Sequence, residues 1–97
     1  MTYRLSDDFI VRHILDETVL VPLGTLVDKY GGFIALNDSG RFCFDLLCEG
    51  QDSDALPGLL CAEYDVSPEQ AKADADGFIR GFTEMGVLIE EPNINKS

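Results

Sequence analysis

The sequence predicts a small α+β domain in which a three-stranded antiparallel sheet is followed by three helices. Up to Leu36, short runs of β-branched and aromatic residues are separated by turn residues, as in strands. From Asn37 onward, apolar residues recur every three or four positions, as on helices that pack against a core. We therefore expect one domain over residues 1–89 and a disordered polar tail over residues 90–97.

Two hairpins account for the predicted sheet. The first hairpin joins a strand over Phe9–Leu15 to a strand over Thr18–Leu23 through a tight turn at Asp16-Glu17. Gly31-Gly32 then allow a sharp backbone reversal into the third strand, Phe33–Leu36. Because consecutive hairpins form a meander, the third strand is expected at an edge of the sheet.

Two helices are expected to follow the third strand. The first begins within residues 37–39, Asn-Asp-Ser, whose side chains all cap helix N-termini, and it ends near Gly50. The second is capped at Asp52-Ser53 and has Pro57 in its first turn, where a missing N–H costs little.

The third helix has the clearest start. Ser67 is the expected N-cap, Pro68 occupies the first helical position, and Gln70 completes a capping box. Gly86 ends the helix, and residues 87–89 are expected to pack back as a short extended piece. One apolar stripe runs along this helix, formed by Ala71, Ala75, Phe78, Phe82 and Met85.

The charge balance argues against two classes of partner. Seven Lys and Arg residues against eighteen Asp and Glu residues give a net charge of -11. Nucleic acids and anionic membranes attract basic faces, so we expect neither as a partner. The sequence contains neither a signal-peptide pattern nor an apolar run of membrane-spanning length, so we expect a cytoplasmic protein.

No motif in the sequence indicates catalysis. Cys43, Cys48 and Cys61 form no CxxC pair and no cluster with His13, the sole histidine, so we expect buried free thiols, no metal and no cofactor. Adjacent carboxylates fall in predicted turns or near the ends of the chain, where they are usually solvated. The sequence therefore predicts a protein that is not an enzyme.

Two other classes of small protein fit part of the pattern. A winged-helix transcription-type DNA-binding domain also combines three strands with three helices, although the polar positions of the third predicted helix are mostly acidic. An acyl or peptidyl carrier protein is also small and acidic, and Asp38-Ser39 superficially resembles its modified serine. In a carrier, however, a bulky apolar residue follows that serine, and here Gly40 follows. Both classes remain alternatives.

The free edge of the third predicted strand offers a site for an extended peptide. An edge strand carries unpaired N–H and C=O groups, which proteins normally shield. If the third helix lies beside this edge, a peptide can add as a fourth strand and place alternate side chains against the helix. The apolar stripe of that helix is expected to be mostly core, with only its margin available for binding.

An ordered series of short motifs supports this interpretation. The series comprises Ile34-x-Leu36-Asn37-x-x-Gly40, Phe44-x-Leu46-Leu47-x-x-Gly50, Tyr64-Asp65-Val66, Asp74-x-x-x-Phe78 and Gly86-Val87-Leu88. It resembles the PqqD-like family, also called RiPP recognition elements, where RiPPs are ribosomally made and post-translationally modified peptides. The resemblance covers roughly residues 3–89.

The resemblance implies a winged-helix-like fold and a non-catalytic role. Members of the family bind the leader segment of a precursor peptide between the third strand and the third helix. They present that peptide to a modifying enzyme, often a radical SAM protein. The partners implied for this chain are therefore a leader peptide and a peptide-modifying enzyme.

Carried over by position, the resemblance implies ten peptide-binding residues. The strand supplies Gly32, Phe33, Ile34, Ala35 and Leu36, and the helix supplies Ala71, Asp74, Ala75, Phe78 and Phe82. We expect a monomer, with a strand-swapped dimer through the unshielded edge as the alternative.

The chain departs from the family pattern at three places. Phe44 stands where a tryptophan is often found, and Ala35 stands where members devoted to pyrroloquinoline quinone usually carry a basic residue. Residues 24–30, which either extend the first hairpin or form an irregular excursion, are longer than expected. These departures argue against the quinone pathway and leave the general role of leader binding intact.

Overall fold

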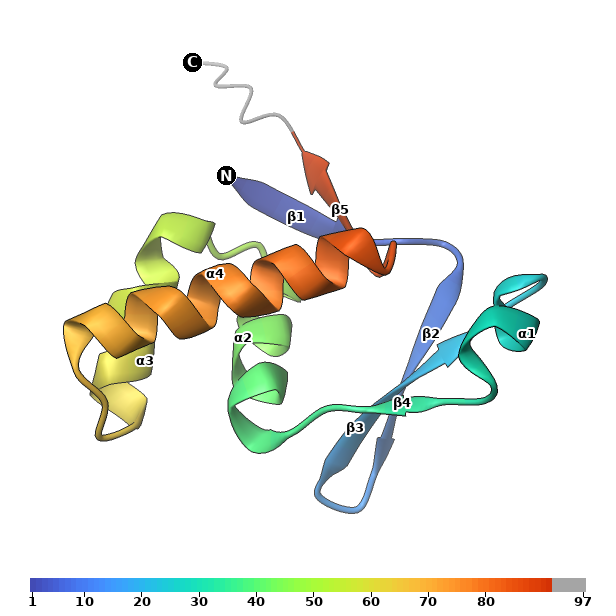
Figure 1. Cartoon of the computed structure of the whole chain (residues 1–97), viewed down its shortest axis with the longest axis horizontal. Helices are drawn as coiled ribbons and strands as arrows, with labels where there is room; N and C mark the ends of the chain where they lie inside the picture. Colours follow the sequence, from blue (N-terminus) through green and yellow to red (C-terminus); the bar gives the residue numbers. More distant parts are fainter. Residues whose placement is uncertain (92–97) are drawn as a thin grey trace.

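The computed structural model describes residues 1–91 and confirms the predicted α+β class. A three-stranded sheet lies beside a cluster of helices, and a two-stranded ribbon joins the two ends of the described chain (Figure 1). In chain order the elements are β1 (Thr2–Leu5), β2 (Phe9–Ile14), β3 (Glu17–Pro22), α1 (Leu26–Tyr30), β4 (Ile34–Ala35), α2 (Asp38–Cys48), a 3₁₀ turn η1 (Ser53–Ala55), α3 (Leu56–Glu63), α4 (Pro68–Glu84) and β5 (Leu88–Glu91).

The predicted antiparallel meander is confirmed, in the order β2-β3-β4. The first hairpin turn, however, lies one residue earlier than predicted. Ile14 pairs with Glu17, so the turn residues are Leu15 and Asp16. Among the described residues β4 pairs only with β3, which leaves β4 at an edge of the sheet as expected.

A second sheet, which the sequence did not indicate, pairs β1 with β5. The antiparallel register runs from Thr2 opposite Glu91 to Leu5 opposite Leu88. The expected extended piece after Gly86 is therefore a strand, and it includes Glu90 and Glu91, which had been assigned to a polar tail. The rest of that predicted tail, residues 92–97, lies outside the described residues.

Residues 24–30 contain a short helix, so neither an extended hairpin nor an irregular excursion is correct. Helix α1 ends at Tyr30, and Gly31 follows in the left-handed region with a φ of 66°. A left-handed residue at this position is a common way to end a helix, and it favours glycine. The Tyr30 hydroxyl donates a hydrogen bond to the Met85 carbonyl oxygen at 3.2 Å, which ties α1 to the C-terminal end of α4.

The predicted N-caps of α2 and α4 are confirmed, whereas the cap predicted for the second helix belongs to the 3₁₀ turn before α3, which itself has no side-chain cap. The Asn37 side chain accepts a hydrogen bond from the Gly40 N–H at 2.7 Å, and the Ser67 hydroxyl accepts from the Gln70 N–H at 3.1 Å. The capping box, however, is only half formed, because the Gln70 side chain donates to Asp74 at 2.8 Å and not to the cap backbone. The Asp52 carboxylate caps η1, which leads directly into α3.

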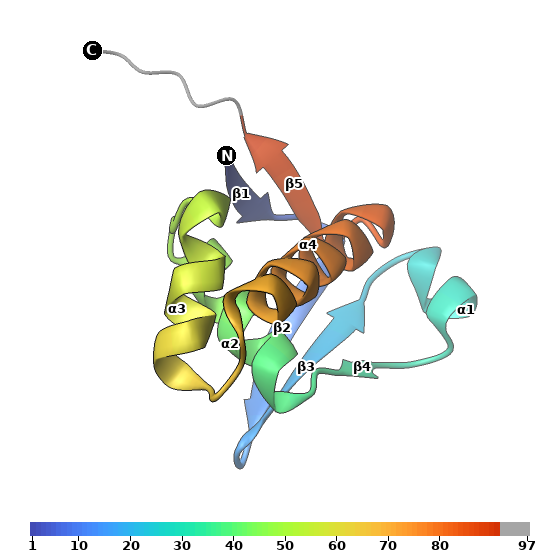
Figure 2. The same cartoon turned by 60° about the vertical axis from the view of Figure 1, so that its left-hand side comes forward.

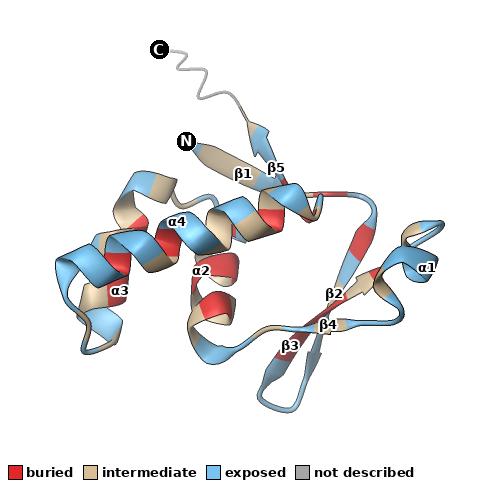
Figure 3. Ribbon diagram, in the orientation of Figure 1, coloured by how far each residue is buried: buried red, intermediate tan, exposed pale blue. Residues whose placement is uncertain are grey.

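The core lies where the helices meet the inner face of the sheet and the ribbon (Figures 2 and 3). Phe44 of α2 is fully buried there, and its ring contacts the Phe82 ring edge-on, with 5.4 Å between ring centres. Cys43 is buried, and burial raises the pKa of its thiol to about 11, so the thiol stays protonated at neutral pH. The expectation of buried cysteines is wrong for Cys48, which is exposed.

Candidate binding site at the β4 edge

The hydrogen-bond phase of β4 decides which backbone groups are available to a partner. Ala35 lies opposite Val19, and the Leu36 N–H donates to the Thr18 carbonyl oxygen at 3.0 Å. In an antiparallel pair, inward-bonded residues alternate with residues whose N–H and C=O point outward. Ala35 is therefore an outward-bonding residue, and by the same period Phe33 is another.

The side chains of this strand alternate between two faces. Ile34 and Leu36 are partly buried and pack against the core. Phe33 and Ala35 are exposed on the opposite face, and Phe33 as a residue is 66% exposed to solvent. Gly32 lines a hollow on that same opposite face. The five predicted strand residues are thus brought together, but they serve two faces of the sheet.

Helix α4 divides its predicted binding residues between the core and the surface. Ala71, Ala75 and Phe82 are buried in the core, so their side chains do not line a surface that a peptide can reach. The assignment of those three residues to peptide binding stays a prediction. Asp74 and Phe78 are half-buried. Their contact with a peptide remains a prediction.

A margin of half-buried positions runs along α4 beside the core stripe. Its members are Asp74, Phe78, Gly81 and Met85, spaced as residues on one helix face. Three contacts direct this margin toward the segment that contains β4. The Met85 carbonyl oxygen accepts a hydrogen bond from Tyr30, which lies just before β4. A Cβ added to Gly40, just after β4, would lie 3.3 Å from Phe78 Cε1. Asp74 lines the same hollow as residues 37–39.

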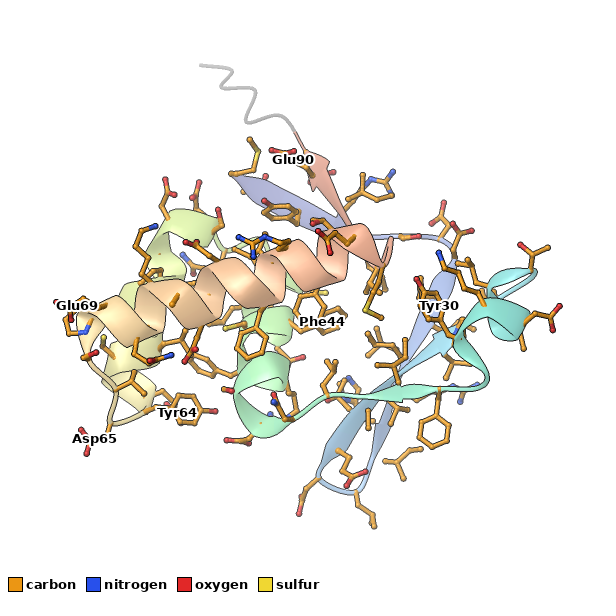
Figure 4. All side chains as sticks on the ribbon, in the orientation of Figure 1. Tyr30, Phe44, Tyr64, Asp65, Glu69 and Glu90 are labelled. Atoms are coloured by element: carbon orange, nitrogen blue, oxygen red, sulfur yellow. The ribbon has the colours of Figure 1, made fainter. Side chains whose placement is uncertain are left out.

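That hollow, of about 340 Å³, lies directly beyond the C-terminal end of β4. Its lining residues are Asn37, Asp38, Ser39, Leu60, Tyr64, Val66 and Asp74. Figure 4 shows the Tyr64 side chain directed toward the first turn of α2. Its hydroxyl donates a hydrogen bond to Asp38 Oδ2 at 2.8 Å, while the Arg41 guanidinium donates to Asp38 Oδ1 at 2.8 Å. The edge of β4 therefore continues into a hollow with apolar walls and a carboxylate-rich rim.

Electrostatics in this hollow follow from the hydrogen bonds to Asp38. The bonds from Tyr64 and Arg41 hold the pKa of the Asp38 carboxyl below its ordinary value. Burial, together with the bond to Asp38, raises the pKa of Tyr64 to about 12. The carboxylate is consequently charged and the phenol neutral throughout the neutral pH range.

Replacing Tyr64 with phenylalanine is expected to raise the pKa of Asp38 toward its ordinary value, because the carboxylate loses a donor that favours its charged form. Since the lowered pKa stabilises the fold above the pKa of the unfolded chain, that contribution is lost as the pH falls through the pKa of folded Asp38. NMR titration of the Asp38 carboxyl carbon measures the change. Tyr30→Phe is the control and leaves the pKa of Asp38 unchanged; an unchanged value in Tyr64→Phe contradicts the bond.

Within residues 1–91, no group of three or more His, Cys, Asp or Glu side chains is arranged to hold a metal ion. No helix in the same range is long and apolar enough to cross a membrane. What the geometry offers is a short free edge strand, an apolar helix margin and an adjoining hollow. These features suit the recognition of an extended chain segment.

The sequence interpretation missed two residues at this site. Tyr30 lies in a segment whose structure the sequence pattern leaves open, and Tyr64 fits the pattern only as part of a helix and of the family series. The spacing of Asp74, Phe78 and Met85 was visible in the sequence. It could not separate the margin from the core stripe, because both have helical period.

The arrangement defines a winged-helix-like α+β domain with a free edge strand, and the residues that flank this strand contact the longest helix. Comparison with protein families then identifies its relatives. The sequence model of the family described as Coenzyme PQQ synthesis protein D (PqqD) matches residues 17–88. The chain belongs to the PqqD family.

Two solved structures resemble the chain over nearly its whole length. One is described as TbiB1 in complex with the TbiA(beta) leader peptide, with 28% sequence identity, a TM-score of 0.74, and coverage of 93% of this chain and 99% of that one. The other is a lasso peptide synthetase B1 complexed with the leader peptide, with 21% identity, a TM-score of 0.77, and coverage of 93% and 100%. No curated protein matches the chain.

Proposed function

We propose that this chain binds the leader segment of a ribosomally made precursor peptide as a fourth strand along β4, and presents it to a peptide-modifying enzyme. The observation that carries the proposal is the outward-facing backbone of Ala35, at a sheet edge beside the half-buried margin of α4. Main-chain pairing of this kind supplies affinity without any catalytic group on the binding protein. The role is therefore recognition, with the chemistry left to the enzyme.

The two faces of β4 determine which side chains of a bound peptide are recognised. A peptide strand paired with Ala35 places alternate side chains on opposite faces. Those on the inner face meet Ile34, Leu36 and Phe78, which are all apolar and partly buried. Two apolar peptide residues separated by one position therefore fit this face. The net charge of -11 further favours a peptide or a partner surface that carries basic residues.

The comparison with TbiB1 supports the proposal beyond the fold. That protein is 28% identical over nearly the full length of both chains, and it is described in complex with a leader peptide. The lasso peptide synthetase B1 shares the fold. A leader peptide as the ligand is therefore consistent with family, fold and edge geometry.

An NMR titration with the leader of the precursor encoded beside this chain's gene tests the proposal. Backbone amide shifts are expected in β4 and along the α4 margin from Asp74 to Met85. Shifts are not expected in the ribbon of β1 and β5, which serves as an internal control. Absence of binding by every precursor encoded nearby would remove the proposed function.

A further inference from the structure

Of the two carboxylates that line the hollow beyond β4, one has no cationic partner. The two are Asp38 and Asp74, and no Lys or Arg side chain lines the hollow with them. Asp38 accepts hydrogen bonds from Arg41 and Tyr64. Asp74 accepts one from the neutral Gln70 amide, and within residues 1–91 it forms no ion pair. Asp74 therefore carries the charge that is left uncompensated in the hollow.

The helix N-termini nearby do not change this balance. A helix N-terminus carries about half a positive charge, and its effect falls off within the first turn. The N-terminus of α2 is met by Asp38, which lies in its first turn, and by the cap from Asn37. Asp74 lies beyond the first turn of α4, so the N-terminus of that helix does not offset its charge. A cation therefore fits the hollow, whereas an anion is repelled.

The apolar walls of the hollow suit the stem of a long cationic side chain. Leu60 and Val66 line it together with Asp74. Its volume of about 340 Å³ lies at the lower end of the range for ligand pockets, about 300–1,000 Å³, and leaves room for one long side chain. Lys and Arg lay their methylene stems along apolar surface and keep the charged group at a polar partner. An apolar side chain would instead cover the Asp74 carboxylate without bonding to it, which is unfavourable.

The hollow lies where an extended leader next places a side chain on the inner face. A leader strand along β4 meets Ile34 and Leu36 on that face. The backbone is still extended at Asn37, which follows Leu36 and lines the hollow. Every second side chain of a strand points to the same face, so the next inner-face side chain lies two positions, or about 7 Å, past the one beside Leu36. That side chain reaches the hollow.

We propose that this hollow is a specificity pocket for one Lys or Arg side chain of the leader peptide, an inference that rests on the proposed function. The ammonium or guanidinium group donates to Asp74, and the stem packs against Leu60 and Val66. The leader segment then has two apolar residues and one basic residue at alternate positions, with the basic residue at the end over the hollow. Pairing along β4 supplies affinity, and Asp74 determines which segment is accepted.

Removing the two charges separately and together tests this inference. The probe is the synthetic leader of the precursor encoded beside this chain's gene, with each Lys and Arg replaced in turn by norleucine, which keeps an apolar stem. On this chain, Asp74→Asn removes the charge and keeps an oxygen that can accept from the Gln70 amide. In isothermal titration calorimetry we expect Asp74→Asn, and norleucine at one leader position, each to weaken binding about tenfold. The two changes combined should weaken it by no more than about twofold beyond either one alone.

Asp76→Asn is the matched control for net charge. Asp76 is exposed two residues farther along α4, and it does not line the hollow. Its replacement removes one negative charge and an exposed ion pair with Lys72, which contributes little. We therefore expect the Asp76→Asn variant to bind the unsubstituted leader within about twofold of wild type. Melting curves by circular dichroism check that both variants are folded.

The possible outcomes separate the two proposals. If the leader binds but no norleucine replacement weakens it, or if a leader without Lys and Arg binds, the specificity pocket is wrong and leader binding stands. Equal losses in Asp74→Asn and Asp76→Asn also overturn the pocket, because only overall charge then matters. Failure of the unsubstituted chain to bind any leader overturns the proposed function itself. The norleucine replacements need no change in this chain, so they decide the matter even if Asp74→Asn does not fold.

Discussion

Replacing Ala35 with proline is expected to reduce affinity for the leader peptide by about 10- to 100-fold. The Ala35 N–H points away from β3, toward the position of the added strand. Proline removes this donor and leaves a peptide carbonyl without a partner, which costs about 1–3 kcal/mol. Isothermal titration calorimetry with the leader peptide measures the loss.

The same substitution is expected to leave the fold intact, because the lost N–H makes no bond to β3 and proline is tolerated on edge strands. Ala35→Ser is the matched control, since it keeps the N–H and changes only an exposed side chain. Ile34→Pro behaves differently. Its N–H faces Leu20 across the ladder, so proline there destabilises the sheet itself. Full leader affinity in Ala35→Pro would show that β4 does not pair with the peptide.

The elements that the sequence predicted correctly are those with local physical causes. Asn37 and Ser67 begin helices because the side-chain oxygen of each accepts a hydrogen bond from the backbone N–H three residues later. Both residue types can be recognised in the sequence. Likewise, the order of strands follows from short connections. Such features depend on neighbours in the chain, so they are readable without the fold.

The elements that were missed depend on partners distant in the chain. Strand β1 exists because Thr2–Leu5 pairs with β5, more than eighty residues away, and four isolated residues carry no such signal. Helix α1 is only five residues long and is held partly by the Tyr30 bond to Met85. Helices this short have little stability of their own, so local propensity does not reveal them.

The candidate site shows the same division. The edge strand and the facing helix were predictable, because both follow from order and period. The phase of hydrogen bonding at Ala35 was not, since it depends on the register between β3 and β4. The sequence also did not predict which residues of the α4 stripe are buried: Ala75 lies in the core, whereas Phe78 is half-buried and belongs to the margin. Tertiary contacts orient that helix, among them its packing against α2 and α3 and the contacts of Gly40 and Tyr30.

Replacing Gly40 with valine is expected to destabilise the fold by about 2–4 kcal/mol. A Cβ at this position would lie 2.7 Å from Asn37 Oδ1 and 3.3 Å from Phe78 Cε1. Displacing the Asn37 side chain breaks the cap of α2, worth about 1 kcal/mol. Crowding the Phe78 ring adds about 1–3 kcal/mol. For a domain of this size the sum corresponds to a melting temperature lower by about 10–25 °C, measured by circular dichroism.

Gly77→Val is the matched control, because Gly77 is a helical glycine of α4 with open space where its Cβ would lie. Valine is slightly more favourable than glycine in a helix, so the melting temperature of this variant should change by less than about 4 °C. Equal losses in the two variants would show that valine in a helix, and not the contact with Phe78, is responsible. A loss confined to Gly40→Val means that the glycine of the Leu36-Asn37-x-x-Gly40 motif allows β4, the α2 cap and the α4 margin to meet, which is the geometry that the proposed leader site requires.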